Sequence, residues 1–138
     1  RMVEIGGSSG ISTIALAAAA RETSGSLISI EIEPRRQQES REILRSLALD
    51  EFVEYICADA GTVLPRLGEV DLALIDCEKE DYARFFDMLR VAAGGIAVAD
   101  NIISHSLTSY VNHVRNRAAL ESVTLPIGKG LEVTRVIR

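Results

Sequence analysis

The stretch VEIGGSSGIS, residues 3–12, joins a short apolar run to a helical pattern and decides how the rest of the chain is interpreted. The run predicts a strand over 2–5, and the pattern that follows predicts a helix near 11–21. Gly6 and Gly10 allow a tight turn with a close backbone approach. The helix N-terminus after them offers unpaired N–H groups to an anionic part of a ligand. The stretch therefore predicts a strand–loop–helix unit with a ligand at its loop.

The same alternation of apolar runs and helical patterns continues along the chain. Because parallel strands need crossover connections, this order predicts an α/β protein whose parallel sheet carries helices on both faces. The runs at 121–127 and 131–138 are too close for a helix between them, so they predict an antiparallel pair. The other predicted strands are 26–31, 53–57, 70–76 and 95–100, and the other predicted helices lie near 35–47, 60–67, 81–91 and 107–119.

The composition indicates one globular domain spanning residues 1–138. Hydrophobic residues make up 47% and charged residues 25% of the chain, as in ordinary globular proteins. No apolar run reaches the ~18 residues that a membrane span needs, so no membrane association is expected. The net charge of −5 argues against a general affinity for nucleic acid. Cys57 and Cys77 lack metal-site spacing and are interpreted as reduced core thiols of a cytoplasmic protein.

Acidic residues follow the predicted strands where a ligand would lie. In an open α/β sheet, ligands bind beyond the carboxyl ends of the strands. Glu31 ends the second predicted strand, 21 residues after Gly10, and a carboxylate there can accept both hydroxyls of a ribose. Asp59 and Ala60 follow the third strand, where Asp59 can accept a hydrogen bond from the exocyclic amine of an adenine. The glycine loop and the acids together favour a nucleoside ligand.

These motifs resemble a known family. The spacing E-x-G-x-x-x-G from Glu4 to Gly10, with IEIEP (30–34) and ADA (58–60), resembles the cofactor site of class I S-adenosylmethionine-dependent methyltransferases. Three further segments are Asp-x-x-Lys-x-x-Tyr at Asp76, Lys79 and Tyr82, Asp-Asn at 100–101, and LPIGKGLEVTR at 125–135. These segments are similar to those of the cation-dependent O-methyltransferases, the group of catechol and caffeoyl-CoA O-methyltransferases. The resemblance implies a Rossmann-like seven-stranded sheet of order 3-2-1-4-5-7-6 with strand 7 antiparallel.

The resemblance also implies residues that bind S-adenosylmethionine. The glycine loop would hold the amino-acid end of the cofactor, Glu31 the ribose, and Ile32 would pack on the adenine. For Ser8 and Ser12, capping of the helix N-terminus is an equally good role. The implied cofactor-binding residues are Glu4, Gly6, Gly7, Ser8, Gly10, Ser12, Glu31, Ile32, Asp59, Ala60 and Asp76.

A divalent cation is the second implied cofactor. Asp76 and Asp100 end adjacent strands, so their carboxylates can converge, and Asn101 adds an amide oxygen. This donor set suits Mg²⁺ and leaves places for two vicinal acceptor oxygens. Asp76 and Lys79 are the implied catalytic residues, with Lys79 as general base or as electrostatic partner of the acceptor oxygen. A lysine pKa of ~10.4 would have to fall, which the cation and partial burial would favour. The neighbouring acids, expected to face water, are Glu78, Glu80 and Asp81.

The chain departs from these relatives around the acceptor. They carry helices before the first strand, which cover the acceptor and often form a dimer interface, whereas this chain reaches its first strand at Met2. The domain thus lacks the segment that is usual in relatives: either it is a core fragment, or its acceptor site is unusually open, or partner subunits close it. The relatives imply that a homodimer is possible. After Asp-Asn the chain has IISHSLTSY (102–110), in which His105 can line the acceptor pocket. Tyr82 is interpreted as a packing residue and His113 as a helix-face residue.

Several functions remain open on the sequence. The first is Mg²⁺-dependent methyl transfer to a hydroxyl of a small diol or phenol. The second is methyl transfer to a macromolecule such as tRNA, against which the net charge counts. The third is a non-catalytic S-adenosylmethionine-binding domain. A domain that had lost catalysis would be expected to lose some catalytic residues, whereas Asp76, Lys79, Asp100 and Asn101 are all present. A nicotinamide-dependent dehydrogenase is the weakest alternative, because G-x-G-x-x-G would need glycine where Ser8 and Ile11 stand.

Overall fold

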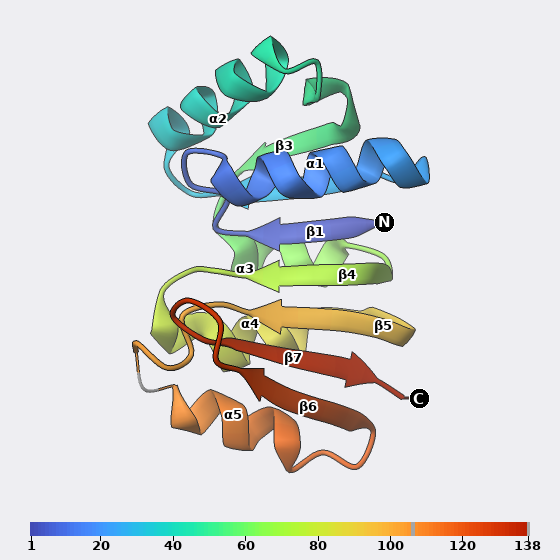
Figure 1. Ribbon diagram of the computed structural model, residues 1–138, viewed down its shortest axis with the longest axis vertical. Helices are drawn as coiled ribbons and strands as arrows, with labels where there is room; N and C mark the ends of the chain where they lie inside the picture. Colours follow the sequence, from blue (N-terminus) through green and yellow to red (C-terminus); the bar gives the residue numbers. More distant parts are fainter. Residues whose placement is uncertain (106, 138) are drawn as a thin grey trace. The chain divides into compact units, whose positions relative to one another are not determined.

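The computed structural model describes residues 1–105 and 107–137 and contains a mixed seven-stranded sheet (Figure 1). The strand order is β3-β2-β1-β4-β5-β7-β6, and β7 runs antiparallel to both of its neighbours. The predicted fold class and strand order are therefore confirmed. No helix in the described part of the chain is long and apolar enough to cross a membrane. The chain divides into two compact units, residues 1–66 and 67–138, and the single domain expected for 1–138 stays a prediction.

The first unit is a three-stranded parallel sheet with its helices. The central strand β2 is buried along its whole length and pairs in parallel with β1 and β3. Its core brings together Ala17, Leu27, Leu44 and Leu49, so both long helices pack on one cluster. The elements are β1 (Met2–Ile5), α1 (Ile11–Thr23), β2 (Leu27–Glu31), α2 (Pro34–Ser46), a 3₁₀ turn (Asp50–Phe52), β3 (Val53–Cys57), α3 (Ala60–Val63) and a second 3₁₀ turn (Leu64–Arg66).

Local sequence explains where these helices begin and end. Helix α2 starts with Pro34, whose fixed φ and missing N–H suit the first helical position. Helix α1 ends in a left-handed residue, Ser24, and the N–H of Gly25 then bonds to the carbonyl of Ala20 at 2.8 Å. The third helix is shorter than the predicted 60–67. It changes to a 3₁₀ turn at Leu64, because Pro65 has no backbone N–H to donate the next hydrogen bond of an α-helix.

The second unit combines parallel and antiparallel pairs. Strands β4 and β5 are parallel, and the β6–β7 hairpin adds to β5 in the antiparallel sense, as the short GKG connection predicts. The elements are β4 (Val70–Ile75), a 3₁₀ turn (Lys79–Asp81), α4 (Tyr82–Met88), β5 (Val91–Ala99), α5 (Thr108–Arg115), β6 (Leu120–Leu125) and β7 (Leu131–Val136). The predicted last strand ran to Arg138, which lies outside the described residues.

Two boundaries in this unit differ from the sequence-based expectation. Helix α4 ends at Met88 rather than at 91, and β5 begins at Val91 rather than at 95. The early start follows from the glycine pair inside β5. Gly94 has φ +83°, and a Cβ on Gly95 would lie 2.9 Å from the Asp71 carbonyl oxygen, so the strand passes through a local irregularity that larger residues would block.

Candidate functional site

The loop between β1 and α1 has the geometry that its glycines predict. Gly6 and Gly10 have φ of 90° and 101°, which only glycine adopts readily. The N–H of Gly6 donates to the carbonyl of Ile30 at 2.9 Å, which ties the loop to the end of β2. Gly10 is the N-cap of α1, and no side chain caps this helix. The capping roles considered for Ser8 and Ser12 are therefore wrong.

Glu4 is a fully buried carboxylate at the base of this loop. Thr13 donates to it at 2.7 Å and Ser29 at 2.8 Å, and Ser12 adds a third hydroxyl. No cationic side chain among residues 1–105 and 107–137 bonds to it. A buried carboxylate needs such donors, because an unpaired one is strongly disfavoured. Sequence analysis missed Thr13 and Ser29; the available signal was Ser29, a hydroxyl inside the otherwise apolar run of β2.

The hydroxyl groups around Glu4 leave no room for a side chain at Gly7. A Cβ at Gly7 would lie 2.4 Å from Ser29 Oγ and 3.0 Å from Glu4 Oε2. Both distances are shorter than ordinary carbon–oxygen contacts, so a side chain at this position would displace the donors of Glu4. Gly7 thus supports the loop by leaving room rather than by its backbone conformation.

Glu31 is held at the carboxyl end of β2 by two backbone donors. The N–H of Ser8 bonds to Oε2 at 2.7 Å, and the N–H of Glu33 bonds to Oε1 at 2.9 Å. The residue is 5% exposed. The next residue, Ile32, is 60% exposed, an unusual state for a large aliphatic side chain. An oriented carboxylate beside an exposed apolar surface fits a ligand that has both hydroxyl groups and a flat ring.

The segment after β3 has a structural role that the sequence did not anticipate. Asp59 is the N-cap of α3, and its Oδ1 accepts the N–H of Gly61 at 2.6 Å. Asp59 is exposed, whereas Ala60 is buried. One carboxylate oxygen of Asp59 is therefore engaged in the cap, and its contact with an adenine amine stays a prediction, as does the contact of Ala60 with the ring.

In the second unit, Asp76, Asp100 and Asn101 follow the ends of the parallel strands β4 and β5. These strands are in register up to the pair Ile75–Ala99. The Nδ2 of Asn101 donates to Asp76 Oδ1 at 2.9 Å, and the backbone N–H of Asn101 donates to Asp100 Oδ1 at 2.7 Å. Asn101 has φ +61°, a conformation in which asparagine is enriched. The structure thus brings Asn101 together with each aspartate, and the cation site that these three residues were expected to form stays a prediction.

Tyr82 is a buried residue that bonds to the backbone just after β5. Its ring is 1% exposed and packs edge-on against Tyr110 with centroids 5.6 Å apart. Its hydroxyl donates to the backbone carbonyl of Asp100 at 2.9 Å. Burial, and secondarily the charge of Asp76, raise the pKa of the Tyr82 phenol well above its usual range, so it stays a proton donor. The packing role is confirmed, and the hydrogen bond gives it a part in positioning Asp100.

The lysine that the sequence singled out lies on the surface. Lys79 is exposed at the start of a 3₁₀ turn, so the partial burial expected for it is wrong. Its neighbours Glu78 and Glu80 are exposed as predicted, and Asp81 is partly buried and pairs with Arg84 at 2.8 Å.

The cysteines and histidines occupy places that only partly match expectation. Cys57 is exposed, so its assignment to the core is wrong; it is the last residue of β3. Cys77 is partly buried, and burial, followed by the charge of Asp81, raises the pKa of its thiol to about 12. His105 is exposed, and its backbone N–H donates to the backbone carbonyl of Asn101 at 3.2 Å. His113 lies on α5, as expected.

The side chains at the ends of β4 and β5 fit a hard cation. Within residues 1–105 and 107–137, no group of three or more histidines, cysteines and acids is arranged to hold a metal ion. The cluster nevertheless offers two carboxylates, and its third member, Asn101, carries an amide oxygen. Mg²⁺ is commonly held in proteins by one or two carboxylates and keeps several waters, so it does not require a third acid.

Comparison with known proteins identifies the family of this chain. Residues 3–102 match the family model described as a methyltransferase domain. The catechol O-methyltransferase of Mycobacterium tuberculosis is 34% identical over 107 residues, covering 75% of this chain and 48% of the relative. The flavonoid 3',5'-methyltransferase of Vitis vinifera is 27% identical over 112 residues, covering 75% and 47%. The chain thus spans about half the length of these curated relatives.

A solved structure extends the likeness to the whole chain. The O-methyltransferase TomG of Streptomyces achromogenes, solved in complex with S-adenosylmethionine, superposes with a TM-score of 0.91. It covers 100% of this chain and 73% of its own length at 21% sequence identity, which establishes the shared fold. The family model matches most of the chain, so the chain belongs to the methyltransferase domain family.

Proposed function

We propose that the protein transfers a methyl group from S-adenosylmethionine to a hydroxyl of a small vicinal diol or phenol, assisted by Mg²⁺. The family supports methyl transfer, and one curated relative is named a catechol O-methyltransferase. The observation that carries the proposal is the placement of Asp76, Asp100 and Asn101 at neighbouring strand ends, where the Nδ2 of Asn101 donates to Asp76 at 2.9 Å and its backbone N–H donates to Asp100 at 2.7 Å. A protein that only bound the cofactor would have no need of this donor set.

Residues of the first unit would bind the methyl donor. Glu31, fixed by two backbone N–H groups, is oriented to accept the ribose hydroxyls. Ile32 supplies an exposed apolar surface for the adenine. The amino-acid end would lie at the loop over Glu4, where the uncapped N-terminus of α1 favours a carboxylate and the acid favours an ammonium group. S-adenosylmethionine, the cofactor in the TomG structure, carries a ribose, an adenine, a carboxylate and an ammonium group.

Residues of the second unit would bind the acceptor through a cation. Asp76, Asp100 and Asn101 would hold Mg²⁺, with Tyr82 fixing the backbone of Asp100. When bound, such a cation orients vicinal oxygens and lowers the pKa of an acceptor hydroxyl. The two carboxylates would balance the double positive charge of the cation, and the amide of Asn101 would add a neutral oxygen ligand. Asp76 is also proposed to contact the cofactor.

Lys79 would assist the acceptor oxygen from its exposed turn. The hydroxyl proton passes to a base, the oxygen forms a bond to the methyl carbon, and the bond from that carbon to sulfur breaks, leaving S-adenosylhomocysteine. We propose Lys79 as that base or as a positive charge beside the oxygen. In the base role, Lys79→Ala lowers kcat by 10²–10⁴; a loss below about tenfold would assign the electrostatic role.

Binding of Mn²⁺, followed by electron paramagnetic resonance with S-adenosylhomocysteine present, tests the cation site without knowledge of the acceptor. The wild-type protein should bind one ion, and Asp76→Asn should lose it. Asp81→Asn is the matched control, because Asp81 lies nearby and pairs with Arg84 instead; it should bind as the wild type does. Equal binding by Asp76→Asn and the wild type, or binding by neither, would contradict the proposed metal-assisted reaction.

A further inference from the structure

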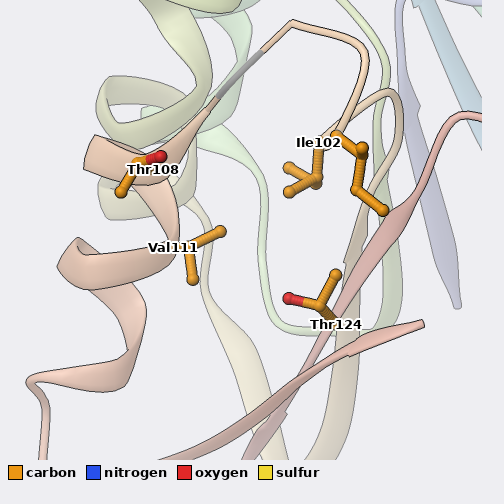
Figure 2. Close-up of a pocket in the computed structure, with 5 residues that line it drawn as sticks. Ile102, Thr108, Val111 and Thr124 are labelled. Atoms are coloured by element: carbon orange, nitrogen blue, oxygen red, sulfur yellow. The ribbon is translucent and has the colours of Figure 1, made fainter. Parts of the chain in front are cut away.

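The second unit contains a pocket beside the turn that carries the proposed cation ligands (Figure 2). Its volume is about 330 Å³, which lies within the range of small-molecule sites. Figure 2 shows side chains of α5 on one side and side chains of the β5–α5 turn and β6 on the other. The lining residues are Ile102, Ile103, Thr108, Val111 and Thr124.

The walls of the pocket are fixed by hydrogen bonds. The N–H groups of Ile102 and Ile103 donate to the carbonyls of Gly130 and Lys129, each at 3.0 Å, which ties the turn to the β6–β7 hairpin. The Thr124 hydroxyl accepts a bond from Arg115 at 2.7 Å and donates one to Glu132. Because these groups are already paired, the walls keep their places when the pocket is empty.

The lining is chemically suited to an aliphatic or aryl group. Two isoleucines and a valine supply most of its surface, and Ile102 is 4% exposed whereas Ile103 is 54% exposed. Thr108 is exposed as well, so the pocket opens to solvent along Ile103 and Thr108. In Figure 2 the Thr108 hydroxyl is directed towards the space facing Ile102, and this hydroxyl has no hydrogen-bond partner among the residues that the structure describes. The pocket thus offers an apolar interior with one polar contact.

We propose that this pocket receives the substituent of the methyl acceptor and sets its specificity, an inference that rests on the proposed function. Ile102 directly follows Asn101, and consecutive Cα atoms lie ~3.8 Å apart, so pocket and cation ligands share one turn. A diol bound through its oxygens beside Asp100 and Asn101 can extend its side chain past Ile102. The preferred acceptor then carries a short aliphatic or aryl substituent, which gains affinity if it ends in a group that can hydrogen-bond to Thr108.

The test compares methylation of catechol and 4-propylcatechol. Each buried methylene favours the substituted acceptor by about fourfold in kcat/KM. Val111→Phe fills the pocket and should lower the ratio of the two kcat/KM values at least tenfold. Val123→Phe is the matched control, because Val123 is 52% exposed on β6 and does not line the pocket; its ratio should equal that of the wild type. Saturation-transfer NMR of the propyl protons, with S-adenosylhomocysteine and Mg²⁺ bound, reports binding separately.

Further variants guard against a folding defect. If Val111→Phe fails to fold, as judged by circular dichroism, Ile103→Ala replaces it and should shift the preference towards 4-pentylcatechol by widening the opening. Thr108→Val should reduce the preference for 4-(3-hydroxypropyl)catechol over 4-propylcatechol about tenfold. Methylation of both acceptors with ratios unchanged by these variants would overturn the inference and leave the proposed function standing. Methylation of neither acceptor would overturn the proposed function and this inference with it.

Discussion

Gly7→Ala tests whether the buried carboxylate of Glu4 organises the cofactor loop. The new Cβ would lie 2.4 Å from Ser29 Oγ, which is too close for the serine to stay in place. If the Ser29 side chain rotates to avoid the clash, its 2.8 Å hydrogen bond to Glu4 is broken. A lost hydrogen bond to a charged group costs ~1.5–3 kcal/mol, and added volume in a packed site costs ~1–3 kcal/mol. Since turning the serine relieves part of the clash, we expect a loss of about 2 kcal/mol in the free energy of unfolding.

A double-mutant cycle with Ser29→Ala isolates this mechanism. Ser29→Ala alone removes the same hydrogen bond and should also cost about 2 kcal/mol. In the double variant the nearest obstacle to the Cβ is gone, and only the 3.0 Å approach to Glu4 Oε2 remains. The double variant should therefore lose about 2–3 kcal/mol, at least 1 kcal/mol less than the sum of the single losses.

Urea unfolding followed by circular dichroism measures the three variants, and calorimetric titration with S-adenosylhomocysteine measures their cofactor affinity. Cofactor affinity should fall in Gly7→Ala more than in a surface control such as Glu22→Ala, which lies exposed on α1. Strict additivity of the two unfolding losses, within about 0.5 kcal/mol, would refute the steric argument. So would a Gly7→Ala variant as stable as the wild type.

Three further predictions concern the second unit. Tyr82→Phe removes the bond to the carbonyl of Asp100 and should cost about 1 kcal/mol in urea unfolding and weaken Mn²⁺ binding; unchanged Mn²⁺ affinity would deny its positioning role. With the thiol pKa of Cys77 at about 12, its alkylation by iodoacetamide should be slow at pH 8 and rise about tenfold per pH unit up to that value; a plateau near pH 9 would contradict this. Burial raises the pKa of Glu132, but hydrogen bonds, first from Arg115, lower it more, so its net pKa is depressed. Glu132 then stabilises the fold above the pKa of the unfolded chain and loses this contribution as pH falls through its depressed folded pKa; acid-unfolding curves should lose that dependence in Arg115→Leu, and an unchanged curve would contradict the assignment.

The fold was predictable because it depends on patterns that are local in the sequence. Short apolar runs alternate with helical patterns, and the turn between 125 and 131 is too short for anything but a hairpin. Helix and strand ends were less predictable. The glycines of β5 permit four additional strand residues, and this effect depends on how closely the Asp71 carbonyl approaches.

The candidate site was predictable where it depends on strand ends and not where it depends on register. Asn101 follows β5 and meets Asp76 after β4 because neighbouring parallel strands end together. Ser29 lies opposite Glu4 in the β1–β2 register, a pairing that no spacing in the sequence reveals. The exposure of Lys79 follows from the charged residues around it, which keep its turn in solvent.

The central claim is metal-assisted methyl transfer to a hydroxyl, and the most direct measurement follows the methyl group itself. The protein is incubated with S-adenosylmethionine labelled in its methyl group, catechol and Mg²⁺, and the products are separated and identified by mass spectrometry. The account predicts singly O-methylated catechol and S-adenosylhomocysteine in equal amounts, with formation abolished by a chelator and by Asp76→Asn. Product formation that is unaffected by the chelator and by Asp76→Asn would contradict it.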